Sequence, residues 1–215
     1  MPVDGPQYPI NLVLRGRSVL VVGGGPVAAQ KVEGLLEGGA DTVLVVAPAV
    51  TEEIARLEAG ALVRVERRRY ASPEAARHRL VVTATSDRDV NHQVFLDAEA
   101  AGVWVNSADD PANCTFTLPA RVRRGPILVT LATGGHSPAL ATWLRRRFER
   151  EFGPEYDALL EILSVERESI KAQGRSTEGL PWQEALDRGL LDLLRADRHQ
   201  EAVELLRTCL SSSSG

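Results

Sequence analysis

The segment over residues 18–36 constrains the fold of this chain more than any other. A short, valine-rich apolar run, residues 18–22, is followed at once by Gly23-Gly24-Gly25-Pro26. Such a run predicts a buried strand, and the glycines predict a tight turn. Apolar residues then recur at helical spacing up to Leu36, and Pro26 suits the first helical position because the amide it lacks has no partner there. We therefore predict a strand, a glycine turn and a helix in direct succession.

Strands and helices alternate through the first half of the chain. Helices are predicted over residues 27–36, over 51–58 and from Asp87 or Asp89 to 101. Alternation with short connections predicts an open parallel sheet covered by helices on both faces. Such sheets bind ligands at the carboxyl ends of their strands. After the first strand, further strands are predicted over residues 42–46, 62–65, 80–84 and 103–105.

The glycine turn fits the pattern G-x-G-x-x-A of dinucleotide-binding Rossmann domains. Gly23 permits the turn, Gly25 lets the backbone approach a pyrophosphate, and Ala28 lets the helix pack close to the strand. A glycine turn without a ligand is the alternative, but the strand before it and the helix after it favour binding. The residues predicted to contact the cofactor follow the strands: Gly23, Gly24, Gly25, Pro26, Val27, Ala47, Pro48, Thr85 and Asn106.

The residue that usually selects the cofactor is missing. NAD-binding Rossmann domains usually place an acidic residue about 20 residues past the glycines, where it holds the ribose hydroxyls. Here the second strand ends Val45-Val46-Ala47-Pro48, with neither an acid nor an arginine directly after it. This rule alone therefore leaves the choice between NAD and NADP open.

The pattern changes after residue 113. Two strands are predicted over residues 115–119 and 127–131, around an arginine-rich turn, and a glycine-containing turn then leads into a helix that ends near residue 151. The predicted fold class is thus α/β: a Rossmann-type domain (1–113), a small α+β segment for dimerisation and substrate binding (114–152), and an α-helical C-terminal region (153–215). Helices are predicted there over residues 155–172, 182–188, 190–195 and 200–210.

Composition excludes several classes of function. The net charge of −4 argues against a nucleic-acid binder. Since no run of about 18 apolar residues occurs, we expect no membrane span. The two cysteines, Cys114 and Cys209, are far apart, which favours a reducing cytoplasm over a disulfide framework. No Cys/His cluster has zinc spacing, and His78, His92 and His199 are not expected to have functional partners.

Several stretches match one family in chain order: residues 21–28 with Lys31, 84–87 with Val90 and Asn91, 105–111, Phe116, 119–120 and 133–141. Over about residues 8–150 the chain resembles precorrin-2 dehydrogenase, the NAD-dependent domain of siroheme synthase. The resemblance implies NAD as cofactor, oxidation of precorrin-2 to sirohydrochlorin on the way to siroheme, and a homodimer. It also implies that Asp109 is the catalytic aspartate. Some members also insert ferrous ion as a substrate, and the sequence does not decide whether this chain does.

The substrate of that family is a polyanion. Precorrin-2 carries eight carboxylates, and arginine binds carboxylates well through two parallel hydrogen bonds. We expect Arg121 and Arg124 to bind some of them; for the arginines at 145–147 and 150 a solvated charged face is the preferred interpretation. The turn before the last helix of the middle segment is a second candidate for a substrate carboxylate: Thr133, Gly134, Gly135, His136 and Ser137.

Other readings of the sequence stay open. Asp109-Asp110-Pro111 also fits an ordinary turn with a capping aspartate. A ligand-sensing Rossmann module would bind NAD without turnover, and a dehydrogenase for a small metabolite would need a His or Lys acid/base that the C-terminal region does not show. The sequence does not determine which arginines touch substrate, the oligomeric state, or the role of the C-terminal helices.

Overall fold

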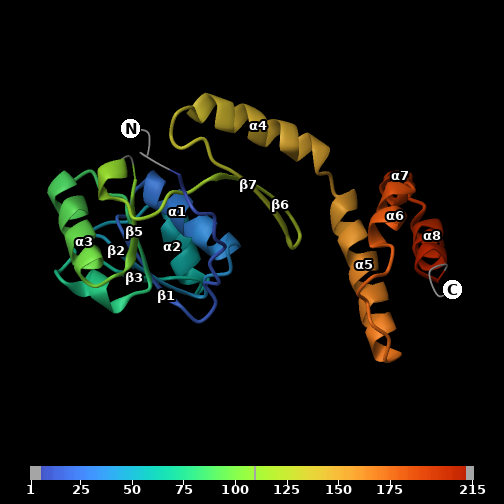
Figure 1. Ribbon diagram of the computed structural model, residues 1–215. Coiled ribbons are helices and arrows are strands. Elements are labelled where there is room, and N and C mark those ends of the chain that lie inside the picture. The colour runs from blue at the N-terminus through green and yellow to red at the C-terminus, as the bar shows by residue number, and fades with distance from the viewer. Residues whose placement is uncertain (1–5, 109, 212–215) are drawn as a thin grey trace. The chain divides into compact units, whose positions relative to one another are not determined.

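The computed structural model describes residues 6–108 and 110–211 (Figure 1). The chain divides into two compact units, one holding the residues up to Leu118 together with Gly134–His136, the other holding Pro119–Thr133 and the residues from Ser137 on. Each unit is described by itself. Asp109, the predicted catalytic residue, lies outside the described residues.

The first unit is built on a parallel sheet of five strands in the order β3-β2-β1-β4-β5. The order reverses between β1 and β4, and ligands of open α/β sheets bind at such a switch point, outside the carboxyl ends of the strands. The predicted parallel α/β fold is therefore confirmed. The strands are β1 (Ser18–Val22), β2 (Thr42–Val46), β3 (Arg64–Glu66), β4 (Leu80–Thr83) and β5 (Trp104–Ser107); the helices are α1 (Pro26–Glu37), α2 (Glu52–Ala59) and α3 (Arg88–Ala100), with short 3-10 turns η1 (Glu74–Arg77) and η2 (Pro111–Asn113).

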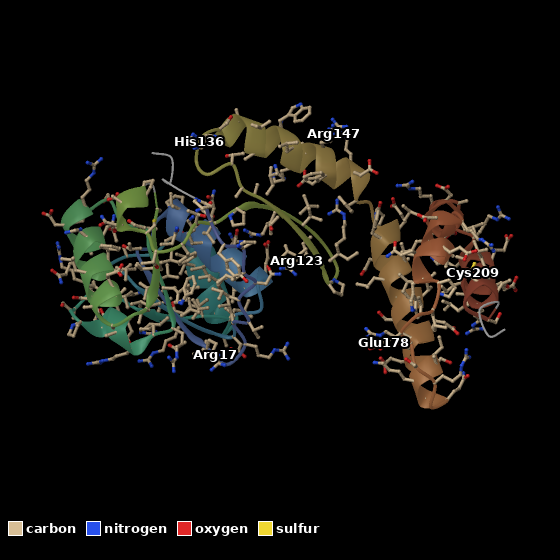
Figure 2. All side chains as sticks on the ribbon, in the orientation of Figure 1. Arg17, Arg123, His136, Arg147, Glu178 and Cys209 are labelled. Atoms are coloured by element: carbon tan, nitrogen blue, oxygen red, sulfur yellow. The ribbon has the colours of Figure 1, made fainter. Side chains whose placement is uncertain are left out.

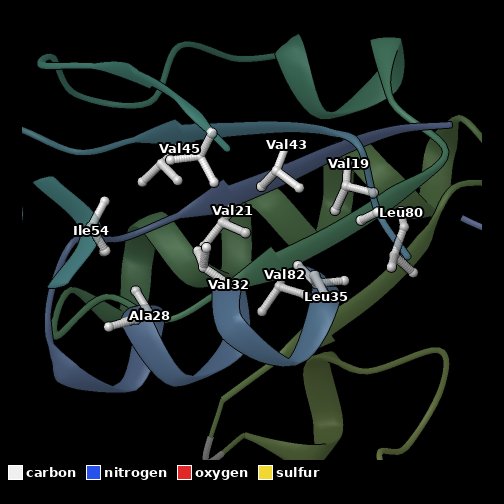
Figure 3. Close-up of a cluster of buried hydrophobic side chains, with 13 residues drawn as sticks. Val19, Val21, Ala28, Val32, Leu35, Val43, Val45, Ile54, Leu80 and Val82 are labelled. Carbon is white, nitrogen blue, oxygen red and sulfur yellow. The ribbon is translucent and has the colours of Figure 1, made fainter. Parts of the chain in front are cut away.

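Apolar side chains cover both faces of this sheet. On one face Val19 and Val21 pack with Val32 of α1 (Figure 3). On the other, Leu20 packs with Val94 of α3. Because β1 is buried on both faces, its sequence is a continuous apolar run rather than an alternating one. Packing on both faces holds β1 in place and so fixes the position of the glycine turn that follows it.

The second unit begins with an antiparallel hairpin and continues as helices. The helices α5 to α8 share one apolar core. Their predicted positions are confirmed to within a residue or two. The elements are β6 (Ala120–Arg124), β7 (Ile127–Leu131), α4 (Pro138–Glu151), α5 (Glu155–Ala172), α6 (Trp182–Asp187), α7 (Leu190–Arg195) and α8 (His199–Ser211).

The strand predicted over residues 115–119 is wrong. The backbone amide of Thr115 donates to the carbonyl of Val105 in β5, as it would in a strand. The amide of Val105, however, donates to the side-chain hydroxyl of Thr115 and not to a backbone carbonyl, so the strand pairing does not continue. The hairpin strand is instead β6, where Val122 is buried between exposed Arg121 and Arg123. The arginines therefore lie in a strand and not in the turn. The division after residues 113 and 152 stays a prediction.

No helix of the described residues is long and apolar enough to cross a membrane.

A buried carboxylate secures the loop between β3 and β4. Glu74 of η1 accepts two hydrogen bonds from the Arg68 guanidinium, at 2.9 and 2.6 Å, and one from the amide of Ala71 at 2.7 Å. Burial by itself would raise the pKa of Glu74, but these donors and the positive charge of Arg68 together lower it.

We predict that Glu74→Gln lowers the free energy of unfolding by about 1–3 kcal/mol at pH 7. A carboxylate whose pKa is lower in the folded state stabilises the fold above its unfolded pKa of about 4.3, and this contribution is lost as the pH falls through the folded pKa. Urea unfolding at several pH values should show the difference from the parent protein shrinking below about pH 4. Glu33→Gln on the exposed face of α1 is the control, and an equal effect of both changes would contradict the assignment.

Candidate functional site

The glycine turn after β1 requires glycine for reasons of space as well as conformation. Gly23 has φ of 128°, and a Cβ built on it would lie 2.4 Å from the carbonyl oxygen of Ala84. A Cβ on Gly24 would lie 2.0 Å from the carbonyl oxygen of Ala49. The turn is thus pressed against the loops that follow β4 and β2, and neither residue tolerates a side chain.

Gly25 differs from its two neighbours because a Cβ built on it would meet nothing within 4 Å. It is the N-cap of α1, it supplies no capping side chain, and the first turn of the helix has no acidic residue. The amides of Val27 and Ala28 lie in the first turn of α1, where amides have no partner within the helix, and this end of the helix carries a partial positive charge beside the open space at Gly25. These features fit a dinucleotide, whose pyrophosphate would approach the backbone at Gly25.

The loop after β2 closes one side of the turn. The amide of Thr51 donates to the carbonyl of Gly24 at 2.9 Å, and the amide of Ala47 donates to the carbonyl of Glu66 at 3.2 Å. Ala47 is buried and Pro48 is exposed. The role of both residues in cofactor binding stays a prediction.

The loop after β4 is organised by Asn91 of α3. Its side-chain amide donates to the carbonyl of Thr85 at 2.9 Å, and its Oδ1 accepts from the hydroxyl of Thr83 at 2.5 Å. The hydroxyl of Thr85 lies 2.8 Å from the same Oδ1, so it is engaged within the loop. Asp87 caps α3, accepting from the amides of Asp89 and Val90. Cofactor binding by Thr85 stays a prediction.

The loop after β5, which carries Asp109 and Asp110, is folded around a thiol. The Sγ of Cys114 accepts from the amide of Ser107 at 3.2 Å and lies 3.3 Å from the carbonyl oxygens of Ser107 and Asp110. Burial raises the pKa of Cys114, so the thiol stays protonated and can donate. Asn106, predicted to bind the cofactor, is buried and donates to the carbonyl of Phe116 at 3.0 Å.

A hydrogen-bond chain also runs from α3 into this loop. Asn113 is buried; its Nδ2 donates to Asp110 Oδ2 at 2.7 Å, and its Oδ1 lies 2.9 Å from Nδ1 of His92. Because the amide donates to the carboxylate, its oxygen must accept, which places the imidazole proton on Nδ1 of His92. His92 thus has a hydrogen-bond partner in the loop, and the expectation that it has no functional partner stays a prediction. His92 and Asn113 are too far apart in the sequence for residue spacing to predict this hydrogen bond.

His78 and His199 also lie against polar side chains. Nδ1 of His78 lies 2.7 Å from the hydroxyl of Ser18, and His199 lies 3.2 Å from a carboxylate oxygen of Asp197. No cluster of three or more His, Cys, Asp or Glu side chains that could hold a metal occurs among residues 6–108 and 110–211.

The turn into α4 is held by its own side chains. The hydroxyl of Thr133 lies 3.4 Å from the amide and 3.3 Å from the carbonyl oxygen of Ser137, whose own hydroxyl caps α4 by accepting from the amide of Leu140 at 3.1 Å. His136 is labelled at this turn in Figure 2. Substrate binding by Thr133, Gly134, Gly135, His136 and Ser137 stays a prediction.

The two predicted substrate arginines differ in their surroundings. Arg124 donates to the carbonyls of Phe152 and Glu149 at 2.7 and 3.0 Å, so much of its guanidinium satisfies the end of α4. Arg121 is exposed on β6. Arg123, between them, is also exposed, and Figure 2 labels it on the hairpin. Substrate binding by Arg121 and Arg124 stays a prediction.

The three glycines allow a paired test of the turn. We predict that Gly23→Ala lowers the free energy of unfolding by about 3 kcal/mol or more, because of the positive φ and the contact with Ala84. Gly25→Ala should cost about 1 kcal/mol or less, since the added methyl meets no protein atom. It should nevertheless weaken NAD binding by about tenfold or more.

Urea unfolding and calorimetric titration with NAD measure the two effects separately. If Gly25→Ala left the NAD affinity unchanged, the open space at this residue would not be the place where the cofactor approaches.

The site just described agrees with comparisons with known proteins. A family model described as "Putative NAD(P)-binding" matches residues 10–120, just over half of the chain. Siroheme synthase of Nitrosococcus oceani is 36% identical over 95% of this chain, and siroheme synthase of Nitrosomonas europaea is 34% identical over 96%. The chain spans 44% of the length of each of these relatives.

A solved structure agrees over nearly the whole chain. The structure of SirC, precorrin-2 dehydrogenase, superposes with a TM-score of 0.73 at 28% identity, covering 94% of this chain and all of SirC. The glycine turn and the helix N-terminus behind it lie in the first unit, and the family model covers that unit from residue 10 to Leu118 and ends at residue 120. The chain therefore belongs to the NAD(P)-binding family that this model describes, and its first unit is a Rossmann domain.

Proposed function

We propose that this protein binds NAD and oxidises precorrin-2 to sirohydrochlorin in siroheme biosynthesis, in the cytoplasm. The observation that carries the proposal is the open, uncapped N-terminus of α1 at Gly25, at the switch point of a Rossmann sheet. The similarity to siroheme synthases and to SirC supplies the substrate. Cys114 and Cys209 are both present as thiols, which agrees with a reducing compartment.

The end of β2 offers no charged residue for either cofactor, so the choice of NAD rests on the similarity to precorrin-2 dehydrogenase. In NADP enzymes a basic residue beyond the second strand commonly holds the 2′-phosphate. Here the strand is followed by Ala47, Pro48, Ala49 and Val50, none of which carries a charge. Bound NAD supplies the hydride acceptor, and the protein must orient the substrate and take up a proton.

Asp109 is the proposed proton acceptor. Its neighbour Asp110 already accepts a hydrogen bond from the buried amide of Asn113, which fixes that carboxylate in the loop. Cys114 secures the same loop through Ser107 and Asp110. In this proposal Asp110, Asn113 and Cys114 shape the loop, and Asp109 takes the proton that the substrate releases as the hydride leaves.

The substrate carboxylates need cationic partners. We assign this role to Arg121, with Arg124 and the Thr133–Ser137 turn as further contacts. Arg124 would contribute only those guanidinium N–H groups that do not already donate to the carbonyls of Phe152 and Glu149.

A homodimer forms part of the proposal. The helix α4 has no buried residue, and Leu140 and Trp143 are 47% and 55% exposed. The guanidinium of Arg147 lies over the ring of Trp143, 5.7 Å from the ring centre. Large apolar side chains left exposed along one helix are typical of an interface with another chain.

The activity predicts a clear difference between the two neighbouring aspartates. Wild-type protein supplied anaerobically with precorrin-2 and NAD should form sirohydrochlorin, measured by absorbance. Asp109→Asn should lower kcat by about 100-fold or more while NAD affinity stays within about twofold, because only the proton acceptor is lost. Asp110→Asn, the matched control, should lower kcat by less than about tenfold, since the amide of Asn113 keeps an acceptor.

Other outcomes of this assay decide between the alternatives. NAD binding without oxidation of precorrin-2 would contradict the proposal and favour a sensing module. Equal losses in both variants would contradict the role of Asp109. Adding ferrous ion afterwards tests metal insertion, which would show as a change faster than without protein.

The dimer predicts an effect of charge on α4. Trp143→Glu should convert the protein from dimer to monomer in size-exclusion chromatography with light scattering at micromolar concentration, because it places a carboxylate in an apolar interface. Val165→Glu, which changes an equally exposed apolar residue on α5, should leave the dimer intact. A wild-type monomer, or a variant that still dimerises, would argue against α4 as the interface.

A further inference from the structure

A cavity lies at the opposite edge of the Rossmann sheet from the glycine turn. It has a volume of about 660 Å³ and is lined by residues at the amino ends of β1, β4 and β5. Since these strands have four or five residues and rise about 3.3 Å per residue, the two edges are roughly 13–17 Å apart. The cavity is therefore separate from the site that the Rossmann fold assigns to the cofactor.

Three arginines make the lining of this cavity cationic. Arg17, Arg77 and Arg79 are exposed, and their guanidinium groups have no hydrogen bond or ion pair within the described part of the chain. The described lining contains no aspartate or glutamate, although the whole chain has a net charge of −4. Figure 2 labels Arg17 on this unit. Clefts lined by one sign of charge concentrate ligands of the opposite sign.

The remaining titratable side chain of the lining contributes little charge. His78 is half-buried and lies against the hydroxyl of Ser18 at 2.7 Å. Burial lowers its pKa, with a further lowering from the charge of Arg77 that opposes the raising effect of Glu74. The positive charge of the cavity thus comes from its three arginines.

The rest of the wall is apolar. Leu12, Val13 and Trp104 line the cavity and are 43%, 80% and 42% exposed. Exposed apolar side chains beside unpaired arginines suit a ligand that has an apolar body and anionic groups at its edge. Inorganic phosphate would use the arginines and leave the apolar wall uncovered. The volume lies within the range of small-molecule sites, about 300–1,000 Å³, which favours a compact molecule over a peptide.

We propose that this cavity, the arginine pocket, binds a tetrapyrrole polycarboxylate as a second, non-reacting site. The identity of the ligand rests on the proposed function, whose substrate and product are apolar macrocycles with eight carboxylates. The arginines pair with carboxylates at the rim of the macrocycle, and Trp104 with Leu12 covers part of its apolar body. Such a site keeps tetrapyrrole bound to the protein without contact with the reacting edge.

Uroporphyrin I, a stable porphyrin octacarboxylate, serves as the probe. Titrations followed by porphyrin absorbance and tryptophan quenching should show two sites per wild-type chain. The variant R17S/R77S/R79S should retain one site. The control R15S/R69S/R175S removes the same charge from three exposed arginines outside the pocket and should keep both. In Trp104→Phe the quenching linked to the second site should be lost.

Four results would overturn the arginine pocket: a single wild-type site that R17S/R77S/R79S retains, two sites in R17S/R77S/R79S, an equal loss in the control, or unchanged quenching in Trp104→Phe. Displacement by inorganic phosphate at the same concentration as by a second porphyrin would show that the pocket binds anions only, which also contradicts the proposal.

Oxidation of precorrin-2 is measured in parallel. The variant R17S/R77S/R79S should keep the wild-type kcat, since its arginines lie away from the reacting edge. If the wild-type protein oxidised precorrin-2 normally but bound no porphyrin in the pocket, only the arginine pocket would be refuted. Absence of oxidation with intact pocket binding would refute the proposed function alone.

Discussion

The close contact of the glycine turn with the neighbouring loops is the constraint on which the site depends. Gly23 and Gly24 leave no room for a Cβ against the carbonyls of Ala84 and Ala49, so the end of β1 is held between the loops after β4 and β2. That contact sets where α1 begins and leaves its first amides open at Gly25. The buried apolar faces of β1 then hold the turn rigidly, because both sides of that strand are packed.

The acidic loop after β5 depends on a different kind of interaction. Polar side chains shape it: the Cys114 thiol, the Asn113 amide and, through that amide, His92. A loop built from directional hydrogen bonds keeps a fixed conformation while remaining at the ligand edge of the sheet.

Local pattern in the sequence predicts most of the fold. Continuous valine runs, the glycine turn and Asp87 as a cap each act over a few residues, so β1, α1 and α3 follow from spacing alone. The strand predicted over 115–119 was wrong because the hydroxyl of Thr115 takes the place of a backbone carbonyl as acceptor for the amide of Val105. These two residues are 10 positions apart, and sequence periodicity does not predict such a contact. The bonds of His92 with Asn113 and of His78 with Ser18 join residues 21 and 60 positions apart, and the arginine pocket gathers three separate segments. Such pairs depend on the sheet order, which composition and spacing do not specify.

The central claim is that the pyrophosphate of NAD lies on the N-terminus of α1. The most direct test is the amide spectrum of ¹⁵N-labelled protein, recorded by nuclear magnetic resonance during titration with NAD. The account predicts the largest shifts at the amides of Gly25, Val27 and Ala28, with little change at Arg17 and Arg79 on the opposite edge. Saturable binding that left the Gly25–Ala28 amides unmoved, or that mainly shifted the opposite edge, would contradict it.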